Sequence, residues 1–73
     1  SNSLVLVFDT KDQQAALSTQ AEAIAAGYLV RLEPSPKKLN ALLDSLKAQG
    51  FASFAVLEEP QKGFAGLKIK PIG

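Results

Sequence analysis

The sequence predicts an α/β fold in which a four-stranded sheet is covered by two helices. The first observation is Leu4–Phe8, five apolar residues in a row, which is typical of a strand buried on both faces. The second is a pair of segments, 10–26 and 35–49, in which apolar residues recur at helical spacing. The third is that these segments alternate with further apolar runs, a pattern that favours parallel strands joined by helical crossovers.

After the first strand, a helix is predicted from Thr10 to about Ala26. Thr10 is a suitable N-cap because Gln13 follows three residues later, which is the spacing of a capping box. Gly27 is expected to end the helix. The residues predicted to face the sheet, by helical spacing, are Leu17, Ala21, Ile24 and Ala25.

The second strand is predicted at Tyr28–Glu33, where two charged residues interrupt the apolar run and favour an edge position. Ser35 and Pro36 then suit the N-cap and first position of a second helix that extends to about Gln49. Its apolar residues follow the i, i+3, i+4, i+7 pattern of a helix face. They are Leu39, Leu42, Leu43 and Leu46.

The third strand is predicted at Ala52–Leu57 and the fourth at Leu67–Lys70, where Pro71 ends it. Crossovers between parallel strands are right-handed, so a sheet order of 1-2-3 would leave the apolar run 4–8 at an edge. The predicted fold is therefore βαβαββ, with sheet order 2-1-3-4, an antiparallel fourth strand and helices on both faces.

The composition excludes several classes of function. The chain has no cysteine and no histidine, which removes disulfides, thiolate sites and the commonest metal ligand and general base. Its acidic residues lack the spacing of a calcium loop, and no glycine-rich phosphate loop follows the first strand. No apolar run approaches the roughly 20 residues of a membrane span. We therefore expect a domain that is not an enzyme, has no metal and no cofactor, and has no membrane partner.

The 73 residues predict a single domain at positions 3–73. Ser1 and Asn2 are interpreted as an expression scar, which would make the chain an excised part of a larger protein. No signal peptide is recognisable, so a cytoplasmic location is expected. The formal net charge of +1 gives no strong electrostatic attraction to nucleic acid.

One candidate site lies where the strand order reverses, because ligands of open α/β sheets favour the carboxyl ends of the strands there. The predicted crevice has Asp9, Thr10 and Lys11 on one side and Glu58 and Glu59 on the other. The simpler alternative is a solvated turn. Adjacent strand residues point to opposite faces, so the two glutamates make a poor acid–base pair.

A second candidate site is the start of the second helix at Ser35, where free backbone N–H groups favour phosphate. Lys37 and Lys38 are predicted in its first turn, where their charge opposes the helix dipole and an anion would relieve the repulsion. The alternative is two lysines that point into water. Lys68 and Lys70 are interpreted as charges that block pairing at a sheet edge.

Several of these segments together carry a resemblance. They are the apolar first strand, an alanine-rich helix ending at Gly27, the pair Lys37-Lys38, the run Phe-Ala-Val-Leu before Glu58-Glu59, and Ile69-Lys70. Over residues 4–72 this pattern resembles the C-terminal anticodon-binding domain of class II aminoacyl-tRNA synthetases, the histidyl-tRNA synthetase type in particular.

The resemblance implies a non-catalytic module that contacts the anticodon stem-loop of a tRNA within a parent histidine–tRNA ligase. The nucleic-acid-binding residues it implies are Lys11, Ser35, Lys37, Lys38 and Glu59. Implied partners are tRNA, the parent chain's catalytic domain, and a protein partner or second copy. Glu58 stands where the family tends to have glycine, and Pro71 where it tends to have aspartate. These departures keep an alternative open, a protein-interaction domain like the regulatory subunit of ATP phosphoribosyltransferase. A small-molecule site in the crevice is a third hypothesis.

Overall fold

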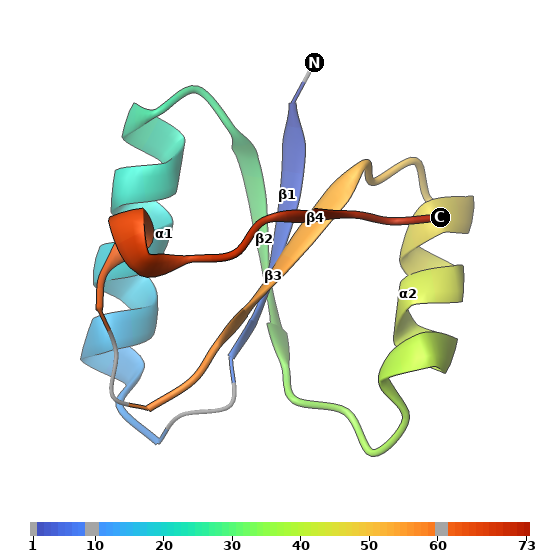
Figure 1. Ribbon diagram of the computed structural model, residues 1–73, viewed down its shortest axis with the longest axis horizontal. Coiled ribbons are helices and arrows are strands. Elements are labelled where there is room, and N and C mark those ends of the chain that lie inside the picture. The colour runs from blue at the N-terminus through green and yellow to red at the C-terminus, as the bar shows by residue number, and fades with distance from the viewer. Residues whose placement is uncertain (1, 9–10, 60–61) are drawn as a thin grey trace.

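The sheet has the order β2-β1-β3-β4, with β1 parallel to β2 and β3, and β4 antiparallel to β3 (Figure 1). This computed structural model describes residues 2–8, 11–59 and 62–73. The predicted strand order and the mixed sheet are confirmed. In chain order the elements are β1 (Ser3–Phe8), α1 (Gln13–Ala25), β2 (Leu29–Pro34), α2 (Leu39–Ala48), β3 (Ser53–Leu57), a 3₁₀ turn η1 (Phe64–Gly66) and β4 (Lys70–Pro71).

The central strand β1 is buried on both faces, because the two helices cover opposite sides of the sheet (Figure 1). Leu4 and Leu6 belong to an apolar cluster with residues of α1, whereas Val5 and Val7 pack with Leu46 of α2. These four side chains are at most 1% exposed. Successive strand residues point to opposite faces, so the middle of a strand between two cores has no position that faces solvent.

The start of α1 differs from the prediction. The N-cap is Asp12, whose carboxylate oxygen Oδ1 accepts a hydrogen bond from the Ala15 N–H at 3.1 Å. Thr10, the predicted cap, lies outside the described residues. Aspartate caps helices at least as well as threonine, so local sequence alone did not separate the two. The end is as predicted, because Gly27 has a φ of 100°, in the left-handed region that glycine adopts without strain.

The predicted sheet-facing side of α1 is wrong. Leu17 and Ile24 are each 54% exposed, and Ala21 and Ala25 are exposed as well. The buried residues of α1 are Ala16, Thr19 and Ala23. These small side chains also follow helical spacing, and they allow the helix axis to approach the sheet closely. The buried Thr19 hydroxyl donates to the Ala15 carbonyl at 2.8 Å, so its burial leaves no unpaired donor.

The helix α2 begins at Leu39, four residues after the predicted N-cap Ser35. The Ser35 N–H instead donates to the Phe8 carbonyl at 3.1 Å, which extends the pairing of β2 with β1 beyond the strand's end. Because Ser35 precedes a proline, the helical conformation is also disfavoured there. The predicted apolar face is confirmed in large part, since Leu46 is 1% exposed and Leu39 and Leu42 pack on the same cluster.

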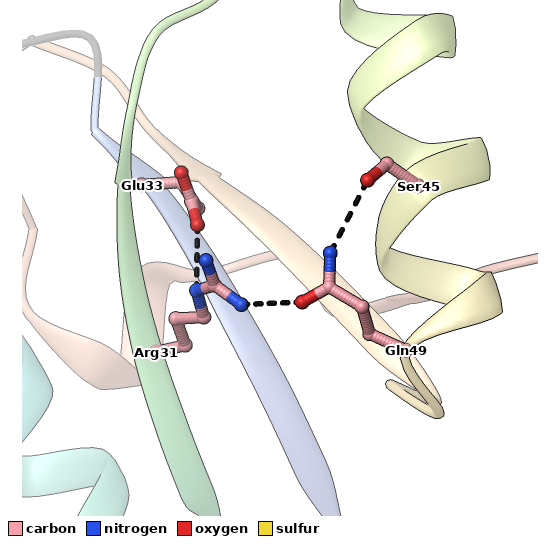
Figure 2. A network of polar contacts seen from close by, with 4 residues as sticks. All are labelled: Arg31, Glu33, Ser45 and Gln49. Carbon is pink, nitrogen blue, oxygen red and sulfur yellow. Dashed lines mark hydrogen bonds and ion pairs between the residues drawn. The ribbon is translucent and has the colours of Figure 1, made fainter.

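A polar network ties the edge strand β2 to the C-terminal end of α2 (Figure 2). The Arg31 Nε lies 2.6 Å from Glu33 Oε1, and an Arg31 Nη1–H donates to Gln49 Oε1, also at 2.6 Å. The Gln49 side-chain N–H then donates to Ser45 Oγ at 3.2 Å. The Arg31 guanidinium also lies 5.7 Å from the ring centroid of Phe51. Arg31 and Glu33, the two charged residues from which an edge strand was predicted, therefore take part in a network that joins β2 to α2.

The C-terminal segment crosses the sheet from the α1 side to the α2 side (Figure 1). Phe64 and Leu67 pack on the α1-side cluster, whereas Ile72 packs on the α2-side cluster. The predicted fourth strand is correct in direction but wrong in its bounds, because Leu67 turns inward before any pairing begins. Only Lys70–Pro71 pairs with β3, and the Ile72 N–H then donates to the Ala52 carbonyl at 3.0 Å. Within the described ranges, no helix is long and apolar enough to cross a membrane.

Candidate functional site

The three parallel strands end at one edge of the sheet, the lower edge in Figure 1. The register places Phe8 opposite both Pro34 and Leu57, so the three strands end level with one another and the residues after β2 and β3 leave the sheet at the same edge. Ser35 and Glu58 therefore lie on this edge, as expected from parallel strands. Asp9 and Thr10, predicted at its centre, lie outside the described residues.

The candidate residues on this edge are solvent-exposed. Lys11 precedes α1, and Lys37 and Lys38 precede the first turn of α2, with Lys38 at the N-cap position. The expectation that the two lysines occupy that first turn is wrong, because α2 begins later than predicted. No side chain caps the helix, and the Lys38 carbonyl accepts its first hydrogen bond, from the Leu42 N–H at 3.3 Å. The two lysine charges therefore lie just before the N-terminus of α2, the positive end of its dipole, and not within its first turn.

A groove of about 460 Å³ opens beside β3 and was not predicted as a whole. One wall is β3 with the residues that follow it, and the other is the segment that leads to β4. The lining residues are Phe54, Val56, Glu58 and Glu59 on the first wall and Lys62, Gly63, Gly66, Leu67, Lys68 and Lys70 on the second. Glu58 and Glu59 line this groove, which differs from the crevice predicted beside Asp9, Thr10 and Lys11; that crevice stays a prediction. The three lysines of the second wall were not predicted to lie there.

The groove exists because β4 covers only the start of β3. The Ala52 carbonyl accepts from the Ile72 N–H and so points toward β4, whereas the Ala52 N–H, just before the strand, donates to Ser3 Oγ of β1. Backbone groups alternate in direction along a strand, which places those of Phe54 and Val56 on the same side. Pairing with β4 ends at Phe54, and no other described strand pairs with β3 on that side. The N–H and carbonyl of Val56 therefore face the groove.

The groove combines cationic, acidic and apolar groups. Three lysines, Lys62, Lys68 and Lys70, face two glutamates, which leaves one formal positive charge, and all five side chains are solvent-exposed. Phe54 and Val56 are half-buried beneath them. Exposed lysines attract phosphate oxygens, while carboxylates and backbone groups accept or donate hydrogen bonds at base edges. The arrangement is suited to binding a polar anionic chain.

The described residues offer little for catalysis. Among them, no group of three histidine, cysteine, aspartate or glutamate side chains could hold a metal ion. The groove contains no histidine or cysteine, and its two glutamates are adjacent in sequence. The groups that line it are suited to binding and orienting a ligand.

Comparison with known proteins finds a relative among the tRNA ligases. A histidine–tRNA ligase from Leifsonia xyli subsp. xyli (strain CTCB07) is 38% identical over 72 residues. The match spans 97% of this chain but only 16% of the length of that curated relative. No family model matches the chain. No solved structure matches it either. The chain is thus similar to a small part of a much longer tRNA ligase.

Proposed function

We propose that this chain is the non-catalytic, anticodon-binding module of a synthetase-type protein and that it contacts a tRNA anticodon stem-loop. The observation that carries the proposal is the similarity to a histidine–tRNA ligase, which runs through 97% of the chain. The match covers only 16% of the relative's length, and the groove is lined by exposed lysines and glutamates above apolar side chains; both observations favour a binding module. In this proposal residues 3–73 form one domain, the partners are tRNA and the parent chain's catalytic part, and the location is the cytoplasm.

The proposed contact surface joins the strand-end edge to the groove. Lys11, Lys37 and Lys38 flank the edge, and Lys62, Lys68 and Lys70 line the groove. Lysines that neutralise phosphates release counterions, which supplies most of the sequence-independent affinity for RNA. Ser35 and Glu59 would add polar contacts, because a hydroxyl can bond to phosphate and a carboxylate can accept from a base amino group. Because these lysines gather along one surface, that surface is more positive than the net charge of +1 for the whole chain indicates.

The proposal is tested by titrating a fluorescently labelled anticodon stem-loop with the chain at several salt concentrations. We expect binding at low salt that weakens steeply as salt rises. Replacing Lys62, Lys68 and Lys70 together with alanine should reduce the salt-dependence slope by about 2, since each single-strand phosphate contact contributes about 0.7. Lys47→Ala, on α2 and not among the residues that line the groove, is the control and should leave the slope nearly unchanged.

Two results would contradict the proposal. The first is no binding of the stem-loop even at low salt. The second is equal loss of affinity for the triple lysine variant and for the Lys47 control once the number of charges removed is taken into account. If the chain does not bind the stem-loop but binds a phosphoribosyltransferase subunit, the result supports the alternative, a regulatory protein-interaction domain.

A further inference from the structure

The wall of the groove that carries Lys62 is attached to α1 by one carboxylate. Glu22 Oε2 accepts a hydrogen bond from the Phe64 N–H at 2.6 Å, across 42 positions of sequence. A side-chain carbon built on Gly63 would lie 3.4 Å from the same oxygen, so the carboxylate sits directly against the turn. Gly63 has a φ of 73°, a backbone conformation that strongly favours glycine. The Glu22 carboxylate therefore contacts the start of η1 at both Gly63 and Phe64.

Apolar contacts hold the later part of this turn, at Phe64 and Leu67. The Phe64 ring packs on the α1-side cluster, with its centroid 6.0 Å from that of Tyr28, and Leu67 packs on the same cluster. Before Phe64 the chain has only Gly63 and Lys62, neither of which belongs to that cluster. The Gly63 carbonyl accepts from the Gly66 N–H at 3.2 Å within the turn, and the hydrogen bond from the Phe64 N–H to Glu22 joins this end of the turn to α1.

The turn also determines where Lys62 points. A side-chain carbon on Gly66 would lie only 2.7 Å from the Lys62 Cβ, which shows how tightly the turn folds back on itself. Any change in the backbone at Gly63 or Phe64 therefore moves the Lys62 side chain. Lys62 lines the groove together with Gly66, so such a movement changes the shape of the lysine wall.

We propose that Glu22 is a positioning residue for the groove: its carboxylate holds the 62–66 turn so that Lys62 faces the ligand. This inference rests on the proposed function only in taking RNA as the ligand. The negative charge of Glu22 and its hydrogen bond to the turn have opposite effects on the binding of RNA. A carboxylate close to a cationic groove weakens the binding of a polyanion by repulsion, whereas a carboxylate that orients a lysine strengthens it.

Two substitutions separate the effects. Glu22→Gln removes the charge but keeps an oxygen that can accept from the Phe64 N–H, and Glu22→Asp keeps the charge but shortens the reach by one methylene. We expect Glu22→Gln to bind the anticodon stem-loop within about twofold of the original chain. Glu22→Asp should bind about tenfold more weakly, which corresponds to losing one hydrogen bond to a charged group. Asp44→Asn on α2 is the control for simple charge removal and should not weaken binding.

The position of the turn is measured without RNA through the amide resonance and hydrogen-exchange rate of Phe64. Glu22→Asp should shift this resonance and speed its exchange, while Glu22→Gln should leave both close to the original values. The positioning role is overturned if Glu22→Asp leaves the Phe64 amide unchanged, or if Glu22→Gln weakens binding as much as Glu22→Asp does. If the original chain binds no stem-loop, the proposed function fails, and the Phe64 measurement still decides whether Glu22 holds the turn.

Discussion

The orientation of α1 can be tested by exchanging a methyl group for an isobutyl group at a position of known burial. Ala23 is 0% exposed and packs in the cluster that contains Leu4 and Leu6. Ala23→Leu forces three additional carbons between helix and sheet. Overpacking of this kind costs about 1–3 kcal/mol. A domain of this length has a total stability of roughly 4–11 kcal/mol, from 0.05–0.15 kcal/mol per residue, so the loss is a substantial fraction.

The matched substitution removes the same isobutyl group from the outer face of α1. Leu17 is 54% exposed, so Leu17→Ala gives up little buried area and gains a better helix former. We expect it to change the free energy of unfolding by less than about 1 kcal/mol. The two variants together therefore report which face of α1 lies on the sheet.

The assay is urea unfolding followed by circular dichroism, with the free energy obtained by linear extrapolation. Ala23→Leu should lower the midpoint and leave the slope unchanged, and heating should show a Tm lower by on the order of 10 °C. The reasoning is refuted if Leu17→Ala costs about 2–5 kcal/mol, the range for truncating a buried leucine, while Ala23→Leu is neutral. That result would mean that α1 packs with the face expected from its larger side chains.

Two further stability predictions accompany the binding experiments on the lysine wall and on Glu22. Leu46→Ala should cost about 2–5 kcal/mol of unfolding free energy, because this α2 side chain is 1% exposed and packs against Val5 and Val7; a loss below 1 kcal/mol in urea unfolding would contradict that packing. Asp12→Ala should cost about 1 kcal/mol through the lost cap of α1, whereas Asp12→Asn, which keeps an acceptor oxygen, should recover most of it; equal losses for both would exclude the capping role.

Elements whose patterns are local were predicted well. The apolar run of β1 implied burial on both faces, and that burial implied the sheet order, because only a central strand lies between two covered faces. The face of α2 followed from four leucines at helical spacing, with only the small side chains of Ala41 and Ala48 on the other side. The exposed ends of the parallel strands, with Ser35 and Glu58, followed from the topology.

Elements whose sequence is compatible with two arrangements were not predicted correctly. α1 carries small and large apolar residues at the same spacing on different faces, and periodicity does not choose between Ala23 and Leu17. Packing against the sheet decides which face is buried, because a helix that lies close to the sheet leaves no room for the larger side chains. The start of α2 was likewise displaced by a backbone hydrogen bond from Ser35 to Phe8, a partner 27 positions earlier in the chain.

The sheet order and the positions of the strand ends were thus contained in local patterns of apolar and polar residues. The groove beside β3 was not, because its two walls come from segments that only folding brings together. Lys62, Lys68 and Lys70 face Glu58 and Glu59 since the chain crosses from the α1 side to the α2 side and pairs with β3 over two residues. The turn that begins this crossing is held by Glu22, 42 residues away from Phe64. Contacts at such separations leave no periodic signal in a sequence, so only the tertiary structure reveals them.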